Sequence, residues 1–430
     1  MRLLLALVMA AALGIGAQAA PDPLEMQGRH FVDLATSLGH LYPREIDAYW
    51  GPPELDKRRS ATPTLAALRR EMVRLRDAVG RDPPSQRRDR LAVRLDHLVA
   101  LTDVIANPNA LSFDQEARAV YGLVAPPPDP EKRLRAYKAL EHLLPGRGDL
   151  TARLSAWRAR FTTPDYRRRV VFMRALEECR VRTRQHWPLP ADEQVDVIWG
   201  ADVPAAWHRY QGHDRSQLEI NPAAVADPGM ALDVACHEAY PGHHAQFLAM
   251  AAQDAAVEDT VVILRSPDQV LREGAANAGV DLAFPSAARL AFTRDVLFPL
   301  AGFDRRDAAA FVQVHRLVDE LAMSVMPVLR DYRDGRLASG DALARLVLDT
   351  QVSSPEALLE FTRDFGAYVS GYTVARDIVT ACMAARAGDR WAVLRAIVAD
   401  RDTKILTSGA ACLAASPGSS LNIGALHVSH

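Results

Sequence analysis

Apolar side chains recur every three or four residues through most of the sequence, which is the spacing that buries one face of an α-helix. The pattern predicts helices over 65–79, 91–105 and 311–329, with Pro327 able to kink the last of them. The apolar positions are Leu65, Leu68, Met72, Leu75, Val79, Leu91, Leu95, Leu98, Leu101, Ile105, Phe311, Val314, Val318, Leu321, Val325 and Leu329. The predicted fold class is therefore mainly α.

Local signals mark further helix boundaries. Ser112 and Gln115 have the spacing of a capping box at the start of a helix. Pro164 suits the first turn of another helix, which extends to about His186. The segment 376–398 is expected to form one more helix near the end of the chain.

The pattern changes near residue 188, where prolines interrupt the helical spacing. Segments 195–198 and 216–221 alternate or cluster in the manner of β-strands. Helical spacing returns at Pro228 and continues to about Met250. A small β element thus precedes a helix. If one of its strands is an exposed edge beside a catalytic site, it can hold an extended peptide by main-chain hydrogen bonds.

The charge balance argues against a polyanionic partner. The 430 residues include 51 basic and 53 acidic side chains, for a formal net charge of -2. The sequence has no basic run with interleaved aromatic residues, which would indicate nucleic-acid binding.

We expect an N-terminal helical region (20–187), a catalytic region (188–413) packed with it as one unit, and a flexible tail (414–430). The sequence does not indicate an oligomeric state.

Residues 1–19 have the features of a secretory signal peptide. Arg2 precedes an uncharged apolar run over 3–15, and 17–19 have the small-x-small form of a cleavage site. The run is too short to span a bilayer comfortably. We therefore predict a periplasmic or secreted protein with no stable membrane insertion after cleavage, and an uncleaved N-terminal anchor is the alternative.

The four cysteines give no metal-type spacing. They are Cys179, Cys236, Cys382 and Cys412. Export permits disulfide bonds, but pairing does not follow from sequence positions alone. For Cys236, which directly precedes the motif described next, we expect a buried free thiol.

The candidate chemistry begins with His237 and Glu238. A His-Glu pair followed by a second His four residues after the first is the H-E-x-x-H zinc motif, in which the Glu acts as general base. Here Pro241 occupies the position of that second His. The motif is therefore incomplete on a regular helix.

Two later histidines could complete the site if the helix is broken. His243 lies six residues after His237, about 600° around a straight helix, and His244 would lie about 10 Å further along the axis. Neither arrangement lets two imidazoles share one zinc ion. Pro241 and Gly242 permit a break that returns one histidine to the metal. The alternative is a helix that simply ends there, with surface histidines beyond.

A third protein ligand is needed, because a catalytic zinc site leaves its fourth position to water. Glu273 is the best candidate, and Asn277, one turn later on the same helix face, could hydrogen-bond a ligand. The alternative for Glu273 is an acidic residue that stabilises a helix N-terminus. Imidazole and carboxylate ligands favour zinc as the cofactor.

Residues 237–244 resemble the H-E-x-x-P-G-H-H signature of a bacterial family designated domain of unknown function 885, which is grouped with gluzincin-type metallopeptidases. Glu273-Gly274 resembles the start of that family's E-G-W-A element, although Ala275 stands where the family has Trp. Further segments resemble other family elements, namely Tyr49-Trp50-Gly51-Pro52, the edge strand before the metal helix (Arg215 to Asn221), and Gly371-Tyr372-Thr373.

The resemblance implies a large helical zinc-metallopeptidase-like fold with a central cleft. It implies zinc bound by His237, His243 and Glu273, with Glu238 as general base. The preference for His243 over His244 as second ligand rests on this resemblance.

Other residues are candidates for substrate contact and catalysis. Tyr372 could donate a hydrogen bond to the oxyanion, with Tyr368 as the alternative, and core packing would equally explain both tyrosines. For Arg376 an ordinary helix-surface position is the alternative to contact with a substrate carboxylate. We expect His208 and His213 to lie solvated in a polar loop. The candidates for substrate binding are Glu219, Asn221, His244 and Arg376.

Together these features predict an exported zinc-dependent hydrolase, most specifically a metallopeptidase acting on a peptide or a small amide. Three alternatives remain open: a zinc hydrolase of a non-peptide amide or ester, a non-catalytic exported binding protein on the same fold, and a helical structural or interaction protein without metal.

Overall fold

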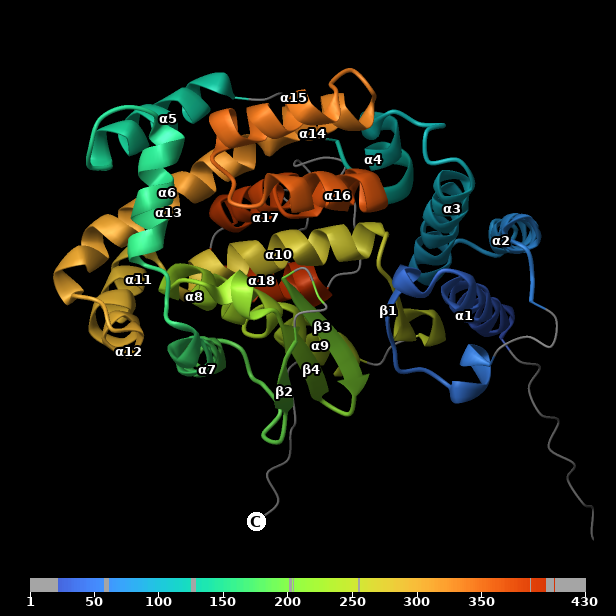
Figure 1. The fold of residues 1–430 in the computed structure, drawn as a ribbon. Helices are drawn as coiled ribbons and strands as arrows, with labels where there is room; N and C mark the ends of the chain where they lie inside the picture. The colour runs from blue at the N-terminus through green and yellow to red at the C-terminus, as the bar shows by residue number, and fades with distance from the viewer. Residues whose placement is uncertain are drawn as a thin grey trace, which may run out of the picture.

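Helices form most of the chain in the computed structural model, which confirms the mainly α fold class (Figure 1). The structure describes residues 22–57, 62–124, 129–200, 203, 205–253, 256–386, 388–399 and 406. The predicted signal peptide, the predicted tail and Cys412 lie outside these residues. Among the described residues, no helix combines the length and apolar character needed to cross a bilayer.

In the described part of the chain, seven α-helices precede the first strand of the larger sheet. They are α1 (Pro23–Leu41), α2 (Leu65–Val79), α3 (Gln86–Ala106), α4 (Phe113–Tyr121), α5 (Pro130–Leu143), α6 (Leu150–Arg160) and α7 (Asp165–Arg184). The predicted capping box is present at α4, where Ser112 and Gln115 each bond the other's backbone N–H. Pro164 is the N-cap of α7, one residue before the predicted position. The predicted helices 65–79 and 91–105 correspond to α2 and α3, whereas α1 and α6 were not predicted.

The second half contains the helices that surround the candidate site. They are α8 (Pro228–Glu238), α9 (His243–Ala251), α10 (Pro267–Ala283), α11 (Ser286–Phe292), α12 (Phe298–Ala301), α13 (Ala308–Ala322), α14 (Met326–Arg333), α15 (Ser339–Arg345), α16 (Pro355–Phe365), α17 (Val374–Ala385) and α18 (Arg390–Ala399). Helix α10 lies at the centre of Figure 1, packed against α8, α17 and α18.

The prediction of one helix over 376–398 is wrong. The segment forms α17 and α18, because Gly388 adopts φ 113°, a left-handed conformation that breaks the helix. The Asp389 side chain then accepts from the backbone N–H of Trp391 and starts α18. The segment 311–329 is also divided, since α13 ends before Pro327, which lies in the first turn of α14.

Three strands form the sheet beside α9. They are β2 (Gln194–Trp199), β3 (Ala206–Gly212) and β4 (Arg215–Ile220), in the order β2-β4-β3, parallel between β2 and β4 and antiparallel between β3 and β4. A separate pair joins β1 (Ile46–Tyr49) to β5 (Val261–Ile263). The prediction that Arg215–Asn221 is an edge strand is wrong. Strand β4 is central, so its backbone is paired on both sides, and β3 is an edge.

The hydrophobic core joins the two predicted regions. One cluster contains Phe31 and Leu68 from the N-terminal region together with Val270 and Leu329 from the later region, all fully buried. A second cluster packs α7, α8 and the three-stranded sheet around Phe172, Leu218, Leu232 and Trp391. Because α8 and α10 are largely buried, side chains on them are held in fixed positions at the candidate site.

Candidate metal centre

The metal motif is divided between two helices, as the Pro-Gly step predicted. Helix α8 ends at Glu238, a cis peptide bond precedes Pro241, and α9 begins at His243. A Cβ atom on Gly242 would lie 1.6 Å from the carbonyl oxygen of His237. Only glycine therefore lets the start of α9 approach the end of α8 this closely.

Three side chains from α8, α9 and α10 converge on one point. The Nε2 atom of His237 lies 3.2 Å from Oε2 of Glu273, and Nε2 of His243 lies 3.5 Å from the same oxygen. All three ligand atoms lie within 4.8 Å of one another. Two ligands about 2.1 Å from one zinc ion at a tetrahedral angle lie about 3.4 Å apart. The two distances from the histidines to Glu273 therefore match those expected for ligands of a single zinc ion.

The bonding state of Glu273 also fits a metal. Its Oε2 atom is buried and accepts no hydrogen bond, although two imidazoles lie within 3.5 Å. Burial would raise the pKa of Glu273, but the imidazoles of His243 and His237 lower it below its ordinary value, so the carboxylate form is favoured. A buried carboxylate oxygen that faces two imidazoles without a well-aligned hydrogen bond suits a cation shared by all three groups.

Hydrogen bonds outside the cluster orient its members. Asn277 Oδ1 lies 3.0 Å from Nδ1 of His237, as the helix spacing predicted. The hydroxyl of Tyr368 donates to Oε1 of Glu273 at 2.9 Å, leaving Oε2 to the cluster. Such contacts fix the tautomer and rotation of metal ligands.

Between the two adjacent histidines, the geometry selects His243. The ring of His244 is fully buried, with Nδ1 2.8 Å from Oγ of Ser216 and Nε2 3.0 Å from Oε2 of Glu193. Both ring nitrogens are thus occupied by protein groups. His244 is neither a metal ligand nor the substrate contact suggested by the sequence.

Glu238 and Tyr372 lie beside the cluster. Glu238 is 9% exposed, and burial raises its pKa against the opposing effect of His237 and His243. The ring of Tyr372 lies 6.2 Å from the ring of His237. Burial, with the charges of Glu273 and Glu238, raises the pKa of Tyr372 well above its ordinary value. Its hydroxyl thus remains a hydrogen-bond donor at neutral pH.

Three predicted substrate contacts are placed elsewhere. Arg376 is held by Asp281 at 2.7 Å and Asp319 at 2.9 Å. Asn221 starts a short 3₁₀ turn after β4, with its amide bonded to backbone groups of residues 203 and 223. Glu219 alternates with the buried Ser216, Leu218 and Ile220, so it faces the opposite side of the sheet from Ser216.

His208 was wrongly expected to be solvated. It belongs to β3, is 6% exposed, and has its ring 5.9 Å from the ring of His243. His213 is exposed in the turn after β3, as expected. Strand β3 was not predicted because its sequence is polar, although its alternate residues His208 and Tyr210 are buried.

Two acidic residues near the cluster were not identified from the sequence. Glu193 bonds His244, and Asp47 on β1 accepts from Gln269 at 3.3 Å. Burial raises the pKa of Asp47 to about 6, while the nearby charges of His243 and Arg272 oppose that rise. No local motif marks Glu193. Asp47 lies two residues before the Tyr49-Trp50-Gly51-Pro52 element, which was the available signal.

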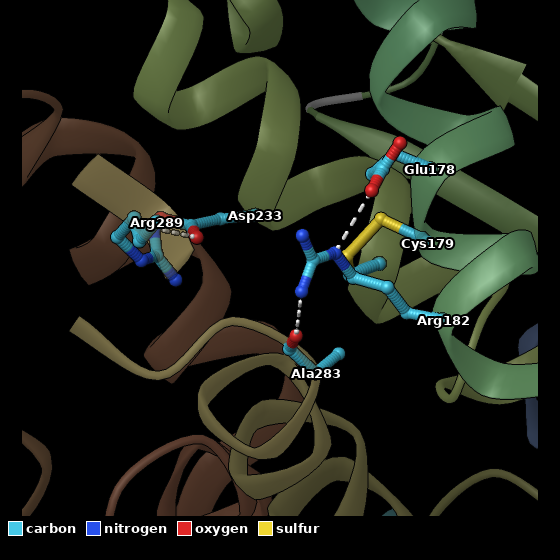
Figure 2. The surroundings of a disulfide bond; sticks show 7 residues. Glu178, Cys179, Arg182, Asp233, Ala283 and Arg289 are labelled. Carbon is cyan, nitrogen blue, oxygen red and sulfur yellow. Dashed lines mark hydrogen bonds and ion pairs between the residues drawn. A yellow bond between two sulfur atoms is a disulfide. The ribbon is translucent and has the colours of Figure 1, made fainter. Parts of the chain in front are cut away.

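The expected free thiol at Cys236 is wrong, because this residue forms a disulfide with Cys179. Helices α7 and α8 pack side by side, which brings together two cysteines separated by 57 residues. Figure 2 shows Arg182 beside this bond, donating to Glu178 and to the carbonyl of Ala283. The disulfide therefore ties α8 to α7 one residue before His237.

Comparison with known proteins gives information on the fold and none on the chemistry. No protein-family model and no curated protein matches the sequence. A structure described as a candidate lipoprotein from Colwellia psychrerythraea is similar over 80% of this chain and 69% of its own, with TM-score 0.50 and 13% identity. A candidate lipoprotein of unknown function from Shewanella oneidensis gives TM-score 0.48 and 10% identity over 81% and 73%. The first likeness indicates a shared fold alone.

Proposed function

We propose that the protein is an exported zinc-dependent hydrolase, and most specifically a metallopeptidase. The observation that carries this proposal is the convergence of His237, His243 and Glu273, with spacing that suits one zinc ion and a buried Glu273 oxygen that accepts no hydrogen bond. Two imidazoles and one carboxylate are the ligand set of catalytic zinc sites in many peptidases.

The chemistry would divide between the metal and Glu238. A zinc ion held by the three side chains would polarise a substrate carbonyl group and lower the pKa of a water molecule. Glu238 takes a proton from the attacking water and delivers it to the leaving amine. Its raised pKa suits this role, because a base with a pKa closer to neutrality exchanges protons more readily in both directions.

Tyr372 supplies a hydrogen-bond donor to the reacting centre. Its protonated hydroxyl stabilises the oxygen of the substrate carbonyl as negative charge develops on it. Tyr368 is the alternative donor, and its hydroxyl donates to Oε1 of Glu273. Edge strand β3, which carries His208 next to the cluster, suits an extended peptide better than the central strand β4 does.

Export of the protein is part of the proposal. The structural neighbour from Colwellia psychrerythraea is described as a candidate lipoprotein, a class of exported proteins. Residues 1–19 have the pattern of a signal peptide, which also favours export.

Substrate profiling tests the proposed activity. Zinc-loaded protein lacking residues 1–19 is incubated with a mixed peptide library and with panels of small amides and esters. We expect peptide cleavage that a chelator abolishes and zinc restores. Cleavage of esters or small amides alone would indicate a different hydrolase, and the absence of any turnover would favour a binding protein.

A further inference from the structure

The short turn that carries the two candidate tyrosines is held by a residue from the N-terminal half of the chain. This turn is the 3₁₀ helix η9 (Gly366–Gly371), which contains Tyr368 and is followed directly by Tyr372. The backbone N–H of Ala367, a fully buried residue, donates to Oε1 of Glu116 on α4 at 3.0 Å. Glu116 is itself 1% exposed, so this bond is shielded from water. A buried backbone N–H group needs an acceptor, and Glu116 supplies it across 251 positions of the sequence.

Gly366 lets the Glu116 carboxylate approach the turn. It adopts φ 56° and ψ −131°, a conformation with positive φ that favours glycine. A Cβ atom on Gly366 would lie 2.0 Å from Oε1 of Glu116, so a larger residue would displace the carboxylate. The other oxygen of Glu116, Oε2, accepts from Arg333 at the end of α14 at 3.3 Å. One oxygen therefore holds η9, and the other forms a buried ion pair.

The turn η9 contacts one candidate ligand directly. Tyr368 lies next to Ala367, and its hydroxyl donates to Oε1 of Glu273 at 2.9 Å, which leaves Oε2 of Glu273 to the metal cluster. At the end of the turn, a Cβ atom on Gly371 would lie 3.0 Å from Cβ of Glu273, so the backbone there also packs against this ligand. The position of η9 therefore sets the orientation of the Glu273 carboxylate.

The residue after η9 is connected to a second candidate ligand. The backbone carbonyl of Tyr372 accepts from the side-chain amide of Asn277 at 3.3 Å. The Oδ1 atom of the same Asn277 lies 3.0 Å from Nδ1 of His237. A displacement of the turn would thus reach both Glu273 and His237. Contacts of this kind orient metal ligands and contribute to metal affinity.

We propose that Glu116 is a positioning residue of the metal centre. Its hydrogen bond to Ala367 fixes η9, so that Tyr368 holds Glu273 in the orientation that binds zinc. The inference rests on the proposed function, because it takes the cluster as a zinc site. It gives the N-terminal half of the chain a part in metal binding, although all three candidate ligands lie in the second half.

Two conservative substitutions separate the hydrogen bond to Ala367 from the ion pair with Arg333. Glu116→Asp keeps the charge but withdraws the carboxylate by one methylene group, so that it no longer reaches Ala367. Glu116→Gln loses the charge but keeps an acceptor oxygen with the same reach. We expect the Kd for zinc, measured by competition with a chelator, to rise about tenfold in Glu116→Asp and to stay close to the parent value in Glu116→Gln.

Glu45→Asp is the matched control. Glu45 is 5% exposed and pairs with Arg265, and in the described chain its side chain forms no hydrogen bond with η9 or with the candidate ligands. This variant should lower the Tm without changing the Kd for zinc, which is measured on folded protein. If Glu116 served stability alone, Glu116→Asp would give the same pattern, a lower Tm and an unchanged Kd.

A double-mutant cycle tests whether Glu116 acts through Tyr368. Tyr368→Phe removes the hydroxyl that donates to Glu273 and should itself raise the Kd for zinc by about tenfold or more. If Glu116 acts by placing that hydroxyl, Glu116→Asp should add little to the loss in the Tyr368→Phe background, because both changes remove the same contact. Losses that simply add would contradict this path.

The outcomes separate this inference from the proposed function. If the parent protein binds zinc and the Kd is unchanged in Glu116→Asp, or rises equally in Glu116→Gln, the positioning role of Glu116 is overturned and the zinc site stands. If the parent protein binds no zinc, the proposed function fails and the role of Glu116 fails with it.

Discussion

Glu238 differs from the neighbouring acidic residue Glu273 in what its carboxylate can do. Glu273 points one oxygen at two imidazoles and the other at Tyr368, so both of its oxygens are committed. Glu238 is buried beside the same imidazoles, with its pKa raised by burial and no place in the ligand cluster. The two carboxylates therefore suit different roles, ligand and base.

The Glu238→Gln variant should retain zinc, and its kcat should fall by at least about a hundredfold, because the amide cannot accept the proton of the attacking water. Metal content and peptide turnover measured on the same sample check this. Glu219→Gln, on the other face of β4, is the control and should keep full activity. A fully active Glu238→Gln enzyme would exclude Glu238 as the base.

Glu193 should stabilise the protein above mildly acidic pH. Burial raises its pKa, but hydrogen bonds from His244, Tyr240 and Arg180 outweigh that effect and lower the pKa from 4.5 to about 2. A group with a depressed folded pKa stabilises the fold above its unfolded pKa and loses that contribution as the pH falls through its folded pKa. The loss should thus lie between pH 4.5 and about 2.

Thermal unfolding of the chelator-treated protein at pH 6 and pH 3 measures this effect. The drop in Tm between the two values should be smaller in Glu193→Gln than in the parent, since the amide does not titrate. Equal drops in both proteins would show that the protonation of Glu193 is not coupled to folding.

At the scale of elements, the junction between α8 and α9 decides whether the ligands meet. Gly242→Ala would place a methyl group 1.6 Å from the backbone of His237, so the two helix ends must separate. We expect a loss of about 3 kcal/mol or more of folding free energy, together with the loss of zinc.

Gly340→Ala is the matched control for that substitution. Gly340 lies in α15 with no atom within 4 Å of an added Cβ, so alanine should be neutral or slightly stabilising there. Denaturant titration and metal analysis of both variants provide the comparison. Normal zinc content in Gly242→Ala would mean that the close approach is not needed to assemble the site.

The Cys179–Cys236 disulfide holds α8 against α7 next to the first ligand. Replacing both cysteines by alanine opens a loop of 57 residues and should cost about 4 kcal/mol in the chain-entropy account. We also expect weaker zinc binding, because His237 directly follows Cys236. Unfolding curves and zinc titration of the double variant check both effects, and unchanged zinc affinity would limit the disulfide to a stabilising role.

Sequence reasoning succeeded where the determining interactions are local. The 3.6-residue period located α2, α3 and the segment of α13 and α14, and the Pro241-Gly242 step predicted a break that returns one of the two later histidines to His237. The choice of His243 came from the family resemblance. Asn277 lies one helical turn after Glu273 on α10, and this spacing predicted that it would hydrogen-bond the side chain of a candidate metal ligand, which is His237. Each of these inferences depends on residues close together in the chain.

The failures concern contacts between distant segments. Strand β3 has polar residues on its exposed face, so its alternation was hidden, and the position of β4 at the sheet centre depends on pairing with both neighbours. The bond between Cys179 and Cys236 requires α7 and α8 to pack, and the role of Glu193 depends on where α9 lies. None of these partners is marked by local spacing.

At the scale of the whole molecule, the candidate centre joins three helices of the central layer. Helices α8, α9 and α10 each contribute one side chain to the candidate metal cluster, and α10 also packs on α17, which follows Tyr372. Gly274 makes this packing possible, since a Cβ there would lie 2.5 Å from the backbone of Ala375. A metal bound by all three helices would stabilise the folded state by mass action.

Zinc content measured by elemental analysis of the purified protein, beside His237→Ala and Glu273→Ala, tests the central claim most directly. We predict about one zinc ion per chain in the parent, as expected for a catalytic site with three protein ligands, and loss of the metal in both variants. Absence of bound zinc in the parent after incubation with the metal, or equal zinc content in all three proteins, would contradict the account.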